Sequence, residues 1–259
     1  MTFVDPHIVL SALGIAIAGG LIGLDRTAVG QFMISQPIVA GPFTGWLLGD
    51  ATTGLLVGAA LELIWILDMP VGSFVPADST VASISATAIA VLGNPGAVYV
   101  PGIGFSILLT VILAPITMRA DQVARQFNAR LADAAQSASG PDLRKRLARA
   151  HVSGVGVFFL KSLAVYLAFL PVGIVAVRLF LAMPDPVHRA MALFVKLLPL
   201  MGAALAARRL SMKAVDLFLL GGFVLAALMG QVFQAPALVI LPLAVAGGLL
   251  GARYRERPS

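Results

Sequence analysis

The sequence predicts an all-α polytopic membrane protein, a helical bundle, and both composition and patterning support this fold class. Of the 259 residues, 59% are hydrophobic and only 12% are charged, about half the ~25% charged share typical of soluble domains. The apolar residues form long runs and do not alternate with period two, which disfavours a transmembrane β-barrel. The mean hydropathy of +0.96 also disfavours disorder and a soluble globular enzyme.

The apolar runs define the expected elements in chain order, because a helix needs roughly 20 apolar residues to cross a bilayer. The first expected span covers residues 8–24. The other expected segments are a broken region at 37–67, a hairpin at 79–118 split by Gly93–Gly96, a long segment at 152–183 that is tilted or broken near Pro171, and spans at 190–207, 214–230 and 235–252.

Positive charge lies mostly between and after these runs. The region 119–149 holds seven basic and three acidic residues, and the positive-inside rule places it in the cytoplasm. The net charge of +6 therefore indicates topology, and no nucleic-acid partner is expected. We expect three parts: an N-terminal membrane half with re-entrant hairpins and the candidate site (1–118), a basic cytoplasmic loop (119–150), and a C-terminal membrane half with a cytoplasmic tail (151–259).

The region 31–80 departs from a bundle of straight helices. The run 37–67 is too long for one span and too interrupted for two, and 69–78 is apolar but rich in proline and glycine. Non-helical backbone at membrane depth is tolerated only where it is buried in protein or lines a wet cavity. Interrupted segments of this kind are the best sequence pointer to the binding site of a transporter. We therefore expect re-entrant hairpins and a binding site here.

Small residues recur at helical spacing within this region. Glycines at 41, 45 and 49 are four residues apart, and so are Gly54, Gly58 and Glu62. Such faces let helices approach closely in lipid, and plain helix packing is the favoured explanation of these glycines. Asp50 follows the first glycine face and precedes Ala-Thr-Thr-Gly, which favours a turn or an N-cap. The predicted hairpin residues are Gly45, Gly49, Asp50, Gly54 and Gly58.

Acidic residues are concentrated in the same region, with five of the twelve between Asp25 and Asp78. A carboxylate at helix-centre depth costs roughly 2.5–3.5 kcal/mol on insertion scales, so such residues tend to be functional. Glu62 continues the second glycine face and is the first candidate for contact with a substrate, followed by Asp68 and Asp78. Two interpretations of Glu62 stay open: substrate contact, or hydrogen bonding to backbone amides at a broken helix end.

Two further side chains complete the candidate substrate-binding set. A neutral polyol is bound by carboxylates and amides together with an aromatic face. Gln36 supplies an amide, and Trp65 supplies an aromatic ring close to the acids. For Trp65 the alternative is anchoring at the membrane interface, where tryptophan is enriched.

The sequence lacks the residues and motifs that metal binding, nucleophilic catalysis and nucleotide binding usually require. The chain contains no cysteine and only three scattered histidines, and it has no zinc-binding HExxH, no GxSxG elbow and no P-loop. We therefore expect no catalytic residue, metal or cofactor. Lys161 and Arg178 lie within the apolar segment 152–183, where they either snorkel or pair with an acid of a partner subunit.

The stretch from Asp25 to Ala90 resembles the IIC subunit of the mannose/fructose/sorbose class of bacterial sugar phosphotransferase systems. The resemblance rests on the pattern G-x-x-x-G-D, then G-x-x-x-G-x-x-x-E, then a P-x-G…P-x-D segment. The matching stretches are LDR at Leu24–Arg26, QPIVAGPFTGWLLGD at Gln36–Asp50, TGLLVGAALEL at Thr53–Leu63 and PVGSFVPADSTVASI at Pro70–Ile84.

The resemblance implies a multi-pass subunit in the bacterial cytoplasmic membrane with an inverted-repeat, elevator-type architecture. It implies a IID membrane partner, cytoplasmic IIA and IIB phosphocarriers, an oligomeric state, and a hexose-like sugar that IIB phosphorylates, so the chain is not an enzyme by itself. It assigns sugar contact first to Glu62 and then to Asp68, Asp78 and Gln36. A stand-alone ion-coupled transporter and a non-transporting scaffold or receptor subunit remain the alternatives.

Overall fold

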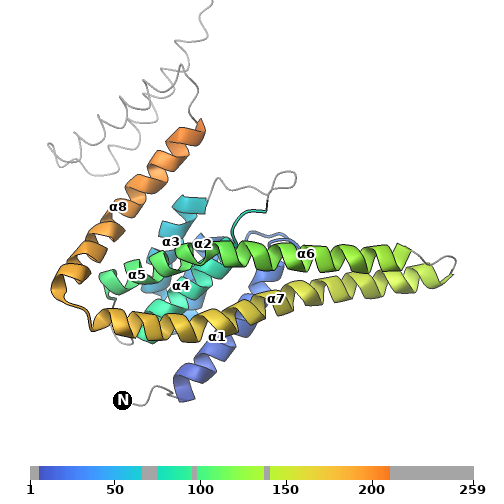
Figure 1. The fold of residues 1–259 in the computed structure, drawn as a ribbon, viewed down its shortest axis with the longest axis horizontal. Helices are drawn as coiled ribbons and strands as arrows, with labels where there is room; N and C mark the ends of the chain where they lie inside the picture. Colours follow the sequence, from blue (N-terminus) through green and yellow to red (C-terminus); the bar gives the residue numbers. More distant parts are fainter. Residues whose placement is uncertain (1–5, 66–74, 95–97, 137–140, 211–259) are drawn as a thin grey trace, which may run out of the picture. The chain divides into compact units, whose positions relative to one another are not determined.

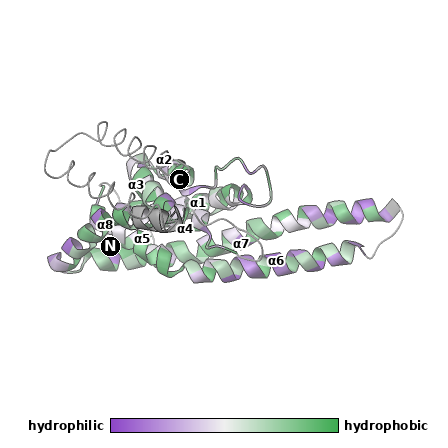
Figure 2. Cartoon of the chain, turned by 90° about the horizontal axis from the view of Figure 1, so that it is seen from above, coloured by the Kyte–Doolittle hydropathy of each residue, from purple (hydrophilic) through white to green (hydrophobic). Residues whose placement is uncertain are grey.

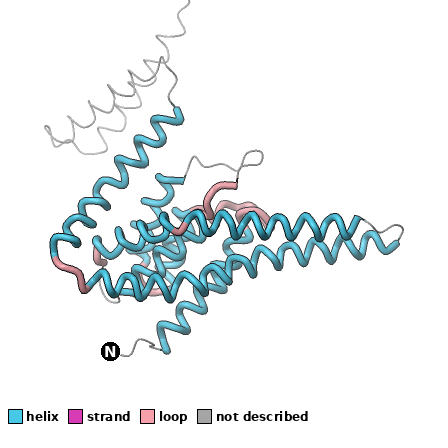
Figure 3. The backbone as a smooth tube through the Cα atoms, viewed as in Figure 1, coloured by secondary structure: helices cyan, strands magenta, loops and turns pink. Residues whose placement is uncertain are grey.

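The computed structural model describes residues 6–65, 75–94, 98–136 and 141–210, and the fold is given for these ranges. Their regular structure is entirely helical, which confirms the predicted all-α class (Figures 1 and 3). The helices are α1 (Pro6–Leu24), α2 (Pro37–Leu47), α3 (Ala51–Trp65), α4 (Ser79–Gly93), α5 (Val100–Ile112), α6 (Ala114–Gln136), α7 (Pro141–Leu181) and α8 (Asp185–Leu210).

The chain divides into two compact units, residues 1–202 and residues 203–259. In the second unit only 203–210, the last turns of α8, belong to the described residues. The spans predicted at 214–230 and 235–252 lie outside them, as does the basic tail. The structure described below is that of the first unit.

Several apolar helices are too short to cross a bilayer. The described helices that are long and apolar enough are α1 and most of α7, and α5 with α6 qualifies as one further span bent by 44°. In contrast, α3 and α4 have 15 residues each. At 1.5 Å per residue each is about 22 Å long, less than the ~30 Å hydrocarbon core. The broken segments predicted at 37–67 and 79–118 are therefore present.

The short helix α4 forms the centre of this unit. It packs against α1, α2, α3, α5 and α7, and nearly all of its residues are buried. Alanine, serine and threonine make up most of it, so neighbouring helices can approach on every side. Its larger side chains, Ile84 and Ile89, join a core with Tyr166 and Val177 of α7.

Helix α7 runs without a break through Pro171, so the break considered there does not occur. Proline removes one backbone hydrogen bond and normally bends a helix. Here Leu170 and Ile174 are buried on either side of it, and a Cβ at Gly173 would strike the side chain of Ile89 on α4. Close packing against α4 holds the helix together at this point.

The basic region expected as a loop is helical. Helices α6 and the first half of α7 run side by side (Figure 1), and hydrophilic residues gather along both (Figure 2). Asn128 donates a hydrogen bond from Nδ2 to the carbonyl of Gly154 over 3.2 Å, which ties the two helices together. Alanine, arginine, glutamine and leucine are strong helix formers, which explains why this polar region is helical.

Candidate functional site

The helices α2 and α3 form a hairpin whose backbones touch through the predicted glycines. A Cβ at Gly41 would lie 2.6 Å from the carbonyl oxygen of Gly54 and 2.9 Å from Cα of Gly58. A Cβ at Gly45 would collide with the carbonyl oxygen of Asp50, and one at Gly54 with that of Gly41. The glycine faces therefore serve close backbone approach, as small residues do between helices in lipid.

The turn of this hairpin is built by Gly49 and Asp50. Gly49 has a φ of +83°, a backbone conformation that glycine adopts at the C-terminal ends of helices without a Cβ penalty. Asp50 caps α3, because its Oδ1 accepts a hydrogen bond from the amide of Thr53 over 2.9 Å and its Oδ2 one from the Thr53 hydroxyl over 2.6 Å.

Glu62 faces the N-terminal end of α2. Its Oε2 accepts a hydrogen bond from the backbone amide of Ile38 over 3.1 Å, one of the amides that the first turn of a helix leaves without an internal partner. The side chain is half-buried, and its Oε1 makes no hydrogen bond to the described part of the chain. The hydrogen bond to a backbone amide considered for Glu62 is therefore present, and among the described residues the other carboxylate oxygen has no partner.

The N-terminal end of α4 also contacts the N-terminal end of α2. Thr80 donates from its hydroxyl to the carbonyl of Ser35 over 2.8 Å, and Ser83 donates to the carbonyl of Pro37 over 3.2 Å. Gln36 lies between these two carbonyls with an exposed side chain that makes no capping bond. We call this meeting of the α2 and α4 N-termini with Glu62 the helix-end site, defined by Gln36, Ile38, Glu62, Thr80 and Ser83.

Asp78 caps α4 and is fully engaged by protein groups. Its Oδ1 accepts from the amide of Val81 over 3.1 Å and lies 3.1 Å from Nη1 of Arg26. Its Oδ2 lies 2.8 Å from Nζ of Lys161. The side chain is 4% exposed. Asp78 is thus held inside the protein between two cations.

These contacts belong to a chain of charges that joins four parts of the unit. Lys161 of α7 also lies 3.4 Å from Asp121 of α6, and Asp121 lies 2.9 Å from Arg125. Arg26 donates from Nη2 to the carbonyls of Pro76 and Ala77 over 3.3 and 3.0 Å. We call Arg26, Asp78, Lys161, Asp121 and Arg125 the charge network.

The expectation that Lys161 snorkels or pairs with a partner subunit is wrong, because both of its carboxylate partners lie within the chain. The partners are 83 and 40 residues away in sequence, so no local spacing reveals them. The sequence holds one signal for this pairing, which is the cost of an unpaired charge in an apolar segment. That cost favours pairing of Lys161 with the acidic residues of the other apolar segments.

Asp25 closes the loop between α1 and α2. Its Oδ1 accepts from the amide of Phe32 over 2.6 Å and its Oδ2 from that of Ser35 over 3.1 Å. The loop needs this support, since Gln31 and Met33 have φ angles of 56° and 66°, which non-glycine residues rarely adopt. Asp25 therefore fixes the loop that delivers Gln36 to the helix-end site.

Two predicted substrate-binding residues remain, Trp65 and Asp68, and the structure describes only Trp65. Trp65 is half-buried and packs against the core cluster that contains Val57 and Leu61. Asp68 lies outside the described residues. Within the described ranges, no group of three or more histidine, aspartate or glutamate side chains is placed to hold a metal ion.

The chain is similar to known proteins over nearly its whole length. A family model described as the sorbose-specific IIC component of the phosphotransferase system matches residues 9–251. The putative N-acetylgalactosamine permease IIC component 2 of Escherichia coli K12 is 35% identical over 82 residues, covering 32% of this chain and 61% of the relative. The mannose-specific EIIC component of the same strain is 31% identical over 93 residues, covering 34% and 35%.

A longer match is found with the sorbose-specific EIIC component of Klebsiella pneumoniae, 28% identical over 218 residues and covering 83% of this chain and 79% of the relative. The matches to the two Escherichia coli relatives span 61% and 35% of their lengths. The fold is similar to that of a solved membrane protein at a TM-score of 0.68 and 23% identity. It is also similar to a chain of the mannose transporter ManYZ in complex with microcin E492 at 0.54 and 23%, and both matches cover 98% of this chain and 97% of the other.

Proposed function

Because the chain belongs to the family of sorbose-specific IIC components of the phosphotransferase system, we propose that it carries a hexose-like sugar across the bacterial cytoplasmic membrane. In this proposal a cytoplasmic IIB protein, recharged by IIA, phosphorylates the sugar and traps it. The chain itself transfers no phosphoryl group. It works with a IID membrane subunit, in an oligomer, and by an elevator-type movement.

The observation that carries this proposal is the helix-end site. Broken helices leave backbone amides without internal partners, and hydroxyl-rich ligands need many donors and acceptors close together. Ile38 orients the Glu62 carboxylate through one oxygen, so the other is preorganised to accept a hydrogen bond from a sugar hydroxyl. The exposed amide of Gln36 adds a donor and an acceptor.

Trp65 is placed to take part in the same sugar site. It follows Glu62 by three residues on α3, and residues at that spacing share a helix face. Its ring would offer an apolar surface to the C–H groups of the sugar, next to the carboxylate. Asp68 remains a candidate contact from the sequence pattern.

We assign Asp78 a positioning role instead of sugar contact. Both of its oxygens are already engaged, one by Arg26 and the Val81 amide and the other by Lys161. A buried carboxylate with three partners has little capacity left for a ligand. Its part is to hold the N-terminal end of α4, where the hydroxyls of Thr80 and Ser83 bond to the carbonyls of Ser35 and Pro37 at the helix-end site.

The test is sugar uptake and phosphorylation by cells that carry Glu62→Gln. The glutamine carbonyl can still accept from Ile38, so the hairpin should fold, but the charge-assisted bond to the sugar is lost. Such bonds contribute about 1.5–3 kcal/mol, so uptake should fall by at least tenfold at normal membrane expression. Asp50→Asn is the matched control, because asparagine caps helices as well as aspartate does. Full uptake by Glu62→Gln would remove Glu62 from the sugar site.

Transport by the purified wild-type protein in proteoliposomes and its thermal stability separate the two alternatives. A stand-alone ion-coupled transporter would move sugar into proteoliposomes without IIA or IIB, driven by an ion gradient. A scaffold would retain a IID-like partner but show no sugar-dependent change in thermal stability. The proposal expects phosphorylation-dependent uptake and a thermal shift with sugar.

A further inference from the structure

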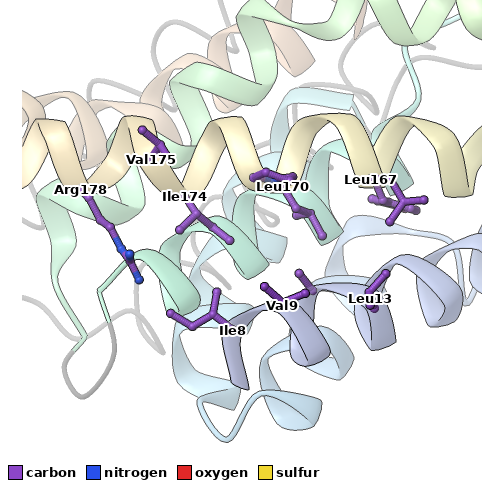
Figure 4. Close-up of a pocket in the computed structure, with 11 residues that line it drawn as sticks. Ile8, Val9, Leu13, Leu167, Leu170, Ile174, Val175 and Arg178 are labelled. Carbon is purple, nitrogen blue, oxygen red and sulfur yellow. The ribbon is translucent and has the colours of Figure 1, made fainter. Parts of the chain in front are cut away.

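A groove between α1 and α7 lies apart from the helix-end site. It encloses about 370 Å³. Its walls come from the start of α1, including Ile8, Val9 and Leu13, and from the second half of α7, including Leu167 and Ile174 (Figure 4). Apart from Tyr166 and Arg178, the side chains that line it are aliphatic.

Arg178 stands at one end of this groove. Its side chain leaves α7 toward the start of α1, near Ile8 (Figure 4). Arg178 as a whole is half-buried, and its guanidinium makes no ion pair or hydrogen bond to any described residue. Lys161 on the same helix, in contrast, lies beside two carboxylates. A guanidinium beside hydrocarbon calls for an anionic partner, and its planar fork matches the oxygens of a phosphate.

The dimensions of the groove fit one leaflet of a bilayer. Leu167 and Arg178 are eleven residues apart, which corresponds to about 16 Å along a helix. Half of a ~30 Å hydrocarbon core is about 15 Å. The walls are open to the side, since Leu13, Leu167 and Val175 are 43%, 44% and 39% exposed.

The chain direction places Arg178 at the level of lipid headgroups. Helix α7 starts within the basic region that the positive-inside rule assigns to the cytoplasm, and Arg178 lies three residues before its other end at Leu181. The charged end of the groove is then at the outer surface of the membrane, and the aliphatic part runs toward the midplane.

We propose that this groove holds one phospholipid, with its phosphate on Arg178 and one acyl chain along the aliphatic walls of α1 and α7. The lipid covers the open side of the aliphatic walls that α1 and α7 form. It also supplies the anion that the described residues do not provide for Arg178. The inference is independent of the sugar path.

The test uses the full-length chain purified from membranes in mild detergent, titrated with dioleoyl phosphatidylglycerol and followed by native mass spectrometry. Wild type should bind one lipid tightly. Arg178→Gln should weaken binding by about tenfold or more, the effect of losing a hydrogen-bonded charge pair, and Arg178→Lys should weaken it less. Arg189→Gln is the matched control, because Arg189 is exposed on α8 and does not line the groove.

Two further experiments test whether an acyl chain occupies the groove. Ala12→Phe should fill the groove from α1 and displace the lipid, whereas Gly14→Phe should not, since a side chain at Gly14 meets open space. Dihexanoyl phosphatidylglycerol, with the same headgroup and short chains, should bind more weakly. Equal lipid binding by wild type and Arg178→Gln, or equal losses in Arg178→Gln and Arg189→Gln, would overturn the proposal. So would photo-crosslinking from position 175 to a membrane protein instead of lipid.

Discussion

At the scale of single residues, one lysine joins two carboxylates in the interior of the first unit. The side chains of Lys161, Asp78 and Asp121 are 9%, 4% and 6% exposed. Removing two charges from water is costly, so the pairing alone is weak evidence for stability. The pairing fixes the relative positions of three helices, because Lys161 of α7 contacts Asp78 at the start of α4 and Asp121 of α6.

Replacing Lys161 by methionine should destabilise the protein strongly. The change leaves Asp78 and Asp121 each short of one cation, and breaking a buried pair from one side costs about 3–5 kcal/mol. Unfolding of the detergent-solubilised chain measures this loss. Arg125→Gln is the control, because Arg125 is 40% exposed and an exposed pair contributes no more than about 1 kcal/mol. Similar losses in the two variants would mean that the charge network is not organised around Lys161.

At the scale of elements, the α2–α3 hairpin depends on contacts between backbones. A Cβ at Gly54 would collide with the carbonyl oxygen of Gly41 and would lie 3.0 Å from Cα of Pro42. These atoms cannot rotate away as a side chain can. The spacing of the hairpin, and with it the distance from Glu62 to the start of α2, is therefore set by glycines.

Alanine at two glycine positions should have opposite effects. Alanine in a helix is favoured over glycine by roughly 0.5–1 kcal/mol, so Gly14→Ala, with open space around it, should raise the thermal unfolding midpoint slightly. Gly54→Ala gains the same propensity but forces α2 and α3 apart, at a cost of about 1–3 kcal/mol typical of overpacking. Its midpoint should fall, and so should sugar uptake. A higher midpoint in both variants would show that the helices do not touch at Gly54.

At the scale of the whole molecule, the sequence predicts what depends on composition and local pattern. Long apolar runs predict the helical membrane class, the interrupted run 37–67 and the split at Gly93–Gly96 predict broken segments, and Asp50 predicts a turn or a cap. Contacts between distant residues leave no such pattern. The pairing of Lys161 with Asp78 is one example, and the unbroken course of α7 through Pro171, which depends on packing against α4, is another.

The length of α7 adds a topological consequence. With 41 residues it is about 62 Å long, twice the ~30 Å hydrocarbon core, so its basic first half must project from the membrane together with α6. The positive-inside rule directs this hairpin to the cytoplasm. The chain contains no cysteine, so single cysteines report position without background.

Cysteines at Gln126 of α6 and Ala148 of α7, both exposed, should react with a membrane-impermeant maleimide only in inside-out vesicles. A cysteine at Val187, beyond the other end of α7 and 38% exposed, should react in intact cells. We expect the hairpin and Val187 on opposite sides of the hydrocarbon, because a single apolar stretch of α7 separates them. Labelling of position 126 in intact cells would invert this topology. It would also move the phosphate end of the lipid groove to the cytoplasmic leaflet.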